Sequence, residues 1–277
     1  VQYIGFSNTY YFVAAAILTV TVLVVLPLQE PLMERAAAAG SGLTRIGAEI
    51  GQFVRDVWDA FTSSRASLIG LFFAVLPAGA MALGLALVNT LAVDLGFDDA
   101  RVAALYLWTT VSAAAGCVIG GWLSDRLGRR RALALFIISM SPITLWLACA
   151  LWQAGWIMPV NDALRARMVI PATLISVFWL TSLLYSFANG LMYGARAALY
   201  MDVSNPRVAA TQFTAYMALL NLGIAYSARW QGWAVDRYGY PLTLLADSII
   251  GLVCLVFLSA MGPITAQRSA VPAPRTD

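Results

Sequence analysis

Seven long apolar runs constrain the fold of this chain more than any other feature. A membrane-spanning helix needs about 20 predominantly apolar residues, and the runs have this character. Charged residues make up only 11% of the 277 residues, whereas a soluble domain carries about 25%. The sequence therefore predicts an all-α integral membrane protein with seven transmembrane helices. They are expected at residues 10–28, 68–93, 102–123, 132–151, 169–195, 211–228 and 241–261.

The composition excludes several kinds of chemistry. All 17 basic residues are arginine, and histidine is absent. Without lysine there is no phosphate-binding Gly-Lys-Ser/Thr loop and no Schiff base. Without histidine there is no His-containing triad, zincin site or His-ligated haem. Cys117, Cys149 and Cys254 lie far apart within apolar runs, so we expect no disulfide, no metal site and no cofactor.

A polar segment at residues 121–131, Gly-Trp-Leu-Ser-Asp-Arg-Leu-Gly-Arg-Arg-Arg, separates two apolar runs and is called the hinge below. Its glycines and arginines are typical of a short turn between closely packed spanning helices. Arginine is enriched in the cytosolic loops of membrane proteins. If residues 29–66 are cytosolic, eleven of the 17 arginines lie inside and five outside, with Arg196 left within a helix. This topology places the hinge on the cytosolic side.

The connector between the first two runs is far longer than the 2–8 residues or so that join helices in a bundle. Residues 36–42 are a low-complexity linker, whereas residues 43–61 have apolar side chains along one helical face. This pattern predicts an amphipathic helix, either on the membrane surface or packed against the protein. The predicted organisation is a first helix at 1–28, a cytosolic connector at 29–66, a six-helix unit at 67–262 and a disordered cytosolic tail at 263–277.

The hinge has an echo later in the chain. Residues 232–239 repeat its spacing of glycine, acid, arginine and glycine, and three predicted spans separate the two copies. An odd number of crossings puts the copies on opposite membrane faces, which predicts two inverted three-helix repeats. The alternative is that Gly-x-x-x-Asp-Arg is simply a common end for a membrane helix.

The hinge, the long amphipathic connector and the six spans after it resemble the carboxy-terminal half of the major facilitator superfamily. Residues 93–97 (Val-Asp-Leu-Gly-Phe), 201–202 (Met-Asp) and 210–213 (Ala-Thr-Gln-Phe) are similar to the peptide, acetyl-coenzyme A and drug transporter group, which includes AmpG-type muropeptide permeases. Residues 76–79 (Leu-Pro-Ala-Gly) differ from the Lys-x-Gly-Asp-like element of those permeases.

This resemblance implies a secondary active transporter in a bacterial inner membrane. It would move a small organic solute by proton-coupled alternating access, and a muropeptide or another amphiphilic anion fits this class. The first span would be the sixth of twelve helices, so the chain would be a piece of a longer transporter and its amino-terminal half would be a partner. Lipid is a further expected partner, and nucleic acid is not.

The hinge residues are the candidates for a conformational latch. A carboxylate there could accept hydrogen bonds from arginines or helix N-terminal amides in one conformation and lose those partners in another. The alternative is that the arginines only set the membrane topology. The predicted latch residues are Gly121, Asp125, Arg126, Gly128, Arg129 and Arg130.

Polar residues on one face of the fifth span are the main candidates for a substrate path, because polar groups in a span turn toward protein or water. Interhelical hydrogen bonding is the alternative. The guanidinium of Arg196 suits a carboxylate or phosphate, unless it snorkels to the surface or pairs with Asp202. The candidates on this face are Ser182, Ser186, Asn189, Tyr193 and Arg196, with Asn89, Gln212, Tyr216 and Asn221 as weaker ones elsewhere.

Asp247 lies within the last predicted span, where ionisation is costly. It is a candidate for proton coupling, or it forms a structural hydrogen bond with Thr243 or a neighbouring helix. Two glycine pairs, Gly116/Gly120 and Gly190/Gly194, predict close helix approach.

Two other functions remain open at this point. One is an integral membrane enzyme, a hydrolase or acyltransferase using a serine or Asp247, although the chain has no Gly-x-Ser-x-Gly elbow and no histidine base. The other is an inactive half-transporter or an assembly partner.

Overall fold

The computed structural model describes residues 6–25, 42–62, 64–156 and 170–261, and the chain divides into two compact units, 1–50 and 51–277. The first unit contains helix α1 (Phe6–Val20), which continues as the π-helical turn η1 (Thr21–Val25). This helix covers the described part of the first predicted span. The predicted linker at 36–42 lies outside the described residues except for Gly42, which begins α2, and the predicted tail at 263–277 also lies outside them.

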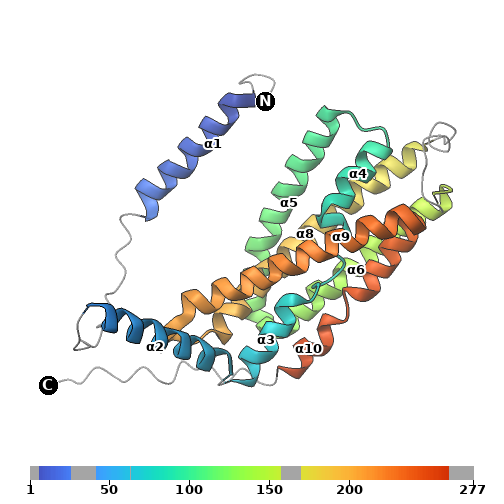
Figure 1. The fold of residues 1–277 in the computed structure, drawn as a ribbon. Coiled ribbons are helices and arrows are strands. Elements are labelled where there is room, and N and C mark those ends of the chain that lie inside the picture. The colour runs from blue at the N-terminus through green and yellow to red at the C-terminus, as the bar shows by residue number, and fades with distance from the viewer. Residues whose placement is uncertain (1–5, 26–41, 63, 157–169, 262–277) are drawn as a thin grey trace. The chain divides into compact units, whose positions relative to one another are not determined.

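Helix α2 (Gly42–Thr62) covers the amphipathic stretch of the connector and crosses the division between the units. Every regular element among the described residues is helical. Figure 1 shows the order of the helices along the chain. After α2 they are α3 (Arg65–Val75), η2 (Ala82–Gly84), α4 (Ala86–Asp94), α5 (Asp99–Leu127), α6 (Arg129–Gln153), α8 (Ala172–Val203), η3 (Pro206–Val208), α9 (Ala209–Ile250) and α10 (Cys254–Ala260).

Four stretches of the described chain are helical, apolar and long enough to cross a membrane. Large apolar side chains on their outer faces are exposed, among them Tyr106, Val118 and Ile249. Exposed apolar surface on long helices is what contact with lipid requires, so the chain is a multi-pass membrane protein. The four stretches are Asp99–Leu127, Arg129–Gln153, Ala172–Val203 and Ala209–Ala260.

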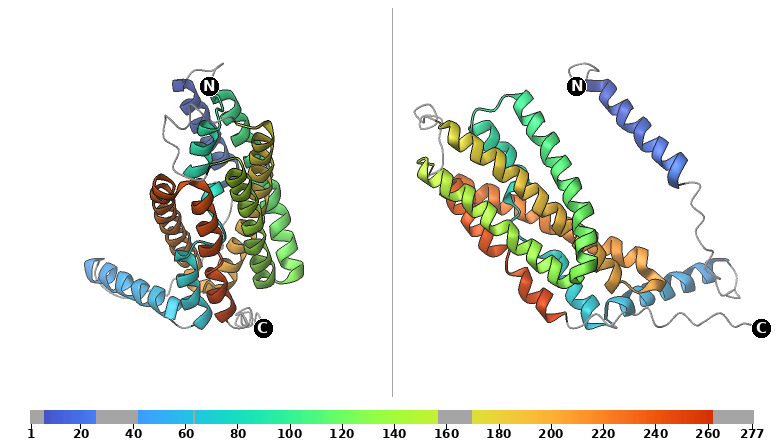
Figure 2. Two further views of the ribbon diagram at one scale, coloured as in Figure 1. Left: turned by 90° about the vertical axis from the view of Figure 1, so that its right-hand side faces the viewer. Right: turned by 180° about the vertical axis from the view of Figure 1, so that it is seen from behind.

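Helix α5 lies along α8, and α8 in turn packs on α6, as the two views of Figure 2 show. Glycines make the first of these contacts possible. A Cβ atom added at Gly190 would lie 2.9 Å from the main-chain nitrogen of Cys117, and one added at Gly194 would lie 3.1 Å from the main-chain nitrogen of Gly121. The predicted close approach at the glycine pairs is therefore confirmed, and both pairs lie in the contact between α5 and α8.

The second predicted span, 68–93, is interrupted rather than continuous. Helix α3 ends at Val75, and Leu76 is extended, with φ −79° and ψ 147°. The following proline disfavours helical geometry at Leu76, and Gly79 adopts φ +83°, a conformation that favours glycine. The chain then resumes as η2 and α4. Apolar composition predicted the length of this span, but Pro77 and Gly79 divide it into two short helices.

The last two predicted spans are joined and then interrupted. Helix α9 contains a sharp bend at Gly239, where φ is 79° and ψ is 171°, and its second arm ends at Ile250 before α10 begins. The break after Ile250 meets the break after α3, because the Gly79 N–H donates to the Gly251 carbonyl at 3.0 Å. A Cβ atom at Gly251 would collide with the Gly79 main chain. Irregular backbone at membrane depth is tolerated where protein encloses it.

Gly239 occupies the same place in the echo segment as Gly128 in the hinge. Gly128 has φ +84°, close to the value at Gly239. The two segments thus turn the chain with similar backbone geometry at the second glycine. The arrangement of the helices as inverted repeats stays a prediction.

Candidate functional site

The hinge forms a network of ion pairs between three helices. Asp125, in the last turn of α5, pairs with Arg129 at the start of α6, with 3.2 Å between Oδ1 and Nη1. The Nε atom of Arg129 also pairs with Oδ2 of Asp202, near the end of α8. Asp125 is 63% exposed, so its pair with Arg129 contributes about 0–1 kcal/mol to stability. Arg129 thus bridges two carboxylates through contacts that are easy to break.

Arg130 connects the hinge to a fourth helix. Its Nη2 atom donates to the carbonyl of Leu258 at 3.0 Å and to that of Ser259 at 3.1 Å, both in α10. The last carbonyls of a helix lack partners within the helix and attract a cation. Arg126 lies over the Trp122 ring instead, with 4.1 Å between Cζ and the ring centroid. The hinge arginines therefore have distinct partners.

The predicted latch residues lie together because they are neighbours in sequence, whereas their distant partners were not predicted. Gly128 makes the turn between α5 and α6, and the Gly121 carbonyl accepts from the Ser124 hydroxyl at 2.7 Å. Asp202 was an alternative partner for Arg196, but it pairs with Arg129. The sequence contains a signal for this pair. The arginine-based topology puts the end of the fifth predicted span, near Asp202, on the same membrane face as the hinge.

The predicted path residues of α8 share one helix but differ in exposure. Ser182 and Arg196 are buried, whereas Ser186, Asn189 and Tyr193 are partly exposed. The contact recorded within this group joins Arg196 and Tyr193, with 5.0 Å between the guanidinium carbon and the ring centroid. Of the weaker candidates, Asn89 on α4 and Asn221 on α9 are exposed.

Gln212 and Tyr216 form hydrogen bonds within the protein. Gln212 accepts from the Asn205 N–H at 2.7 Å, and its Nε2 atom donates to the Ala60 carbonyl at 3.3 Å and to the Tyr216 hydroxyl at 3.2 Å. The Tyr216 hydroxyl donates to the Ser67 carbonyl at 3.1 Å. These bonds fasten the beginning of α9 to the end of α2 and the beginning of α3.

Asp247 links α9 to the break in the second predicted span. Its Oδ2 atom accepts from the Ala82 N–H at 2.9 Å, and its Oδ1 atom accepts from Nε2 of Gln231 at 2.7 Å. Gln231 and Asp247 are equally distant in sequence from the bend at Gly239, so the two arms of α9 bring them together. The Thr243 hydroxyl donates to the Gly239 carbonyl instead. Sequence reasoning missed Gln231 because it lies beyond the predicted sixth span.

Arg196 is buried without a carboxylate partner. The residue is 2% exposed, and its Nε and Nη2 atoms are enclosed and form no hydrogen bond within the described chain. The hydroxyl of Tyr200, one turn further along α8, is enclosed and unpartnered in the same way. A buried cation and a buried hydroxyl thus lack acceptors.

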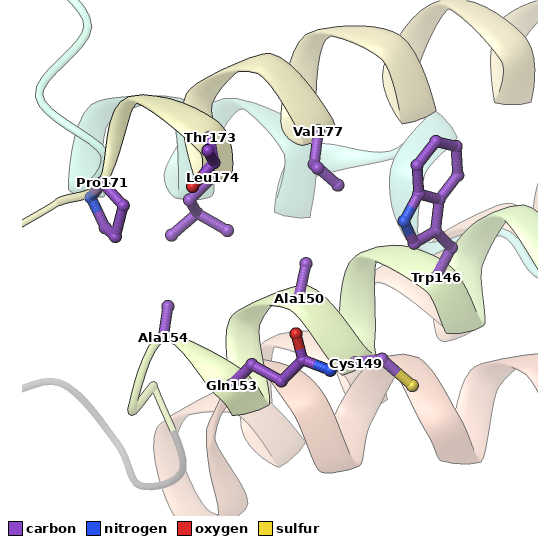
Figure 3. A pocket seen from close by; sticks show the side chains of 9 residues that line it. All are labelled: Trp146, Cys149, Ala150, Gln153, Ala154, Pro171, Thr173, Leu174 and Val177. Atoms are coloured by element: carbon purple, nitrogen blue, oxygen red, sulfur yellow. The ribbon is translucent and has the colours of Figure 1, made fainter.

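A cavity of about 310 Å³ lies between the end of α6 and the beginning of α8. Figure 3 shows Thr173 and Val177 of α8 across it from Ala150 and Gln153 of α6. None of the predicted path residues lines this cavity. The described residues also contain no cluster of three or more His, Cys, Asp or Glu side chains that could hold a metal ion.

Comparison with protein families gives one match. A family model described as Major Facilitator Superfamily matches residues 1–228, which is more than half of the chain. Searches of curated proteins and of solved structures returned no match. Members of this family are in general secondary transporters and not enzymes. The family match, the multi-pass helical fold and the hinge agree, and the chain therefore belongs to the major facilitator superfamily.

Proposed function

We propose that this chain forms the carboxy-terminal six-helix half of a proton-coupled carrier that moves a small organic solute by alternating access. Helix α1 would be the last helix of the amino-terminal half. The observation that carries the proposal is the network at the hinge, where Arg129 and Arg130 connect α6 to the ends of α5, α8 and α10.

Alternating access requires two conformations of similar free energy, so contacts that distinguish them must be weak individually. The pairs at Arg129 meet this requirement because Asp125 and Asp202 are both partly exposed. Arg129 could keep one carboxylate while it loses the other. The hinge would face the cytosol in a bacterial inner membrane, as the distribution of arginines indicates.

Two features support the remaining parts of the proposal. The polar face of α8 offers a path for the solute, and Asp247 is a buried carboxylate that could carry the coupled proton. The segments similar to the peptide, acetyl-coenzyme A and drug transporter group suggest a muropeptide-like solute or another amphiphilic anion.

Sealed membrane vesicles that contain the complete protein test this function. Labelled organic acids, peptides and muropeptides would be offered under an imposed pH gradient. We expect accumulation of one of these classes, and we expect a protonophore to abolish it. Uptake that does not depend on the pH gradient would contradict proton coupling. Chemical conversion of a compound by the detergent-solubilised protein would instead indicate an enzyme.

Neutralising either acid of the hinge network should slow transport while leaving insertion intact. A conformational equilibrium shifted by about 1 kcal/mol changes by about fivefold, so uptake by Asp125→Asn or Asp202→Asn should fall by this order. Initial uptake rates at matched expression measure the effect. Asp99→Asn, at an exposed acid in the first turn of α5, is the control. Normal rates in both hinge variants would discard the latch.

A further inference from the structure

Arg196 carries a charge that no carboxylate of the described residues neutralises. Removing a guanidinium from water is costly unless a carboxylate or a set of hydrogen bonds compensates for it. Here the compensation is limited to the ring of Tyr193. We propose that Arg196 binds the anionic group of the transported solute, which is therefore a carboxylate or a phosphate ester. This inference rests on the proposed transport function.

Three buried or partly buried acids of the described chain already have partners of their own. Asp202 pairs with Arg129 at the hinge, and Asp247 accepts hydrogen bonds from Gln231 and the Ala82 N–H. Asp94 accepts from the Tyr240 hydroxyl at 2.6 Å. None of these buried or hinge carboxylates is paired with Arg196, so an anion from outside the described chain is the natural complement.

A second unpartnered donor lies on the same face of α8. Tyr200 is four residues after Arg196, a spacing that places two side chains next to each other on a helix. The Tyr200 ring is held by stacking on Tyr216, with 4.8 Å between the ring centroids. Its hydroxyl therefore has a restricted position. A carboxylate or phosphate offers several acceptor atoms, which suits a guanidinium and a hydroxyl together.

The ring of Tyr193 packs against the guanidinium of Arg196. Tyr193 is partly exposed, whereas Arg196 itself is enclosed. An anion that binds the guanidinium would compete with this ring contact. The cost of the uncompensated charge favours binding of an anion.

The purified complete protein allows a direct test by thermal melting. The probes are lactate, succinate and glycerol 3-phosphate, with lactamide, succinamide and glycerol as uncharged counterparts. We expect at least one anion to raise the melting temperature of the wild-type protein, and its uncharged counterpart to have no effect. The rise should disappear in Arg196→Met and Arg196→Gln. It should persist in Arg101→Met, which changes an exposed arginine.

The same experiment has a readout that needs no ligand. Removing an uncompensated buried charge should raise the melting temperature of unliganded Arg196→Met above that of the wild type by about 2–4 °C. Three results would overturn the proposal. The first is that no anion raises the wild-type melting temperature. The second is that the rise persists in Arg196→Met, and the third is that unliganded Arg196→Met melts well below the wild type. The last result would show that contacts within the protein already compensate the charge of Arg196.

Uptake of the stabilising anion into proteoliposomes separates this inference from the proposed function. Binding that depends on Arg196, without uptake, would leave the anion site standing and contradict transport. Uptake of an uncharged solute that Arg196→Gln does not alter would support transport and overturn the anion site. Arg196→Lys keeps the charge but loses the planar donor fork, so binding should weaken by about tenfold and not vanish.

Discussion

Replacing Gly190 by valine is expected to separate α5 from α8 and to destabilise the six-helix unit by about 3 kcal/mol or more, the upper range of overpacking penalties. A Cβ atom at this position would meet the carbonyl group of Ala113 and lie 2.9 Å from the main-chain nitrogen of Cys117. Both obstacles belong to the main chain of α5. Rotation of side chains cannot remove them, so the helices must move apart.

The separation would affect the whole contact between the two helices. The Ser112 hydroxyl donates to the Leu183 carbonyl across it at 3.0 Å, and Gly116 and Gly120 lie against the main chain of α8. All of these contacts depend on the same distance between α5 and α8, so a larger distance at Gly190 weakens each of them. The fraction of monodisperse protein in detergent and its melting temperature measure the effect.

Gly232→Val is the matched control for this experiment. Gly232 is also helical, and a Cβ atom there would have open space around it. Both variants make the same change in helix propensity, from glycine to a β-branched residue, so the difference between their melting temperatures reports the packing. Equal melting temperatures for the two variants would contradict the close packing of α5 on α8.

The helices that could be predicted from sequence are those whose apolar run is also regular in backbone geometry. Residues 102–123 and 132–151 fall within α5 and α6 because the main chain of these runs stays helical throughout. Pro142 lies inside α6 without ending it. The run at 68–93 is as apolar, but Pro77 and Gly79 act on the main chain, which hydropathy does not register.

At the candidate site, contacts between residues close in sequence could be predicted, whereas contacts between distant residues could not. The ion pair of Asp125 and Arg129 joins residues four apart and follows from the sequence. The pair of Arg129 and Asp202 depends on the packing of α6 against α8. The alternative pair of Arg196 and Asp202 could have been rejected from sequence, since residues six apart on a helix do not face each other.

Replacing Asp247 by asparagine is expected to abolish uptake driven by a pH gradient, because the amide cannot take up the coupled proton. The carboxylate also accepts two hydrogen bonds, from the Ala82 N–H and from Gln231. An asparagine can accept only one of them through its oxygen, so we expect a loss of stability of about 1–3 kcal/mol. Exchange of labelled for unlabelled solute across the membrane, without any gradient, should persist.

Gln231→Leu separates the two roles of Asp247. It removes one hydrogen bond to the carboxylate but leaves a group that can bind a proton, so its stability should fall by a similar amount while gradient-driven uptake remains. Melting temperature, exchange and gradient-driven uptake of both variants therefore form a complete comparison. If Asp247→Asn keeps gradient-driven uptake, the carboxylate serves only to hold α9 against the break at Ala82, and the proton must bind elsewhere. If both variants lose exchange as well, the contact of α9 with this break is itself required for the change between conformations.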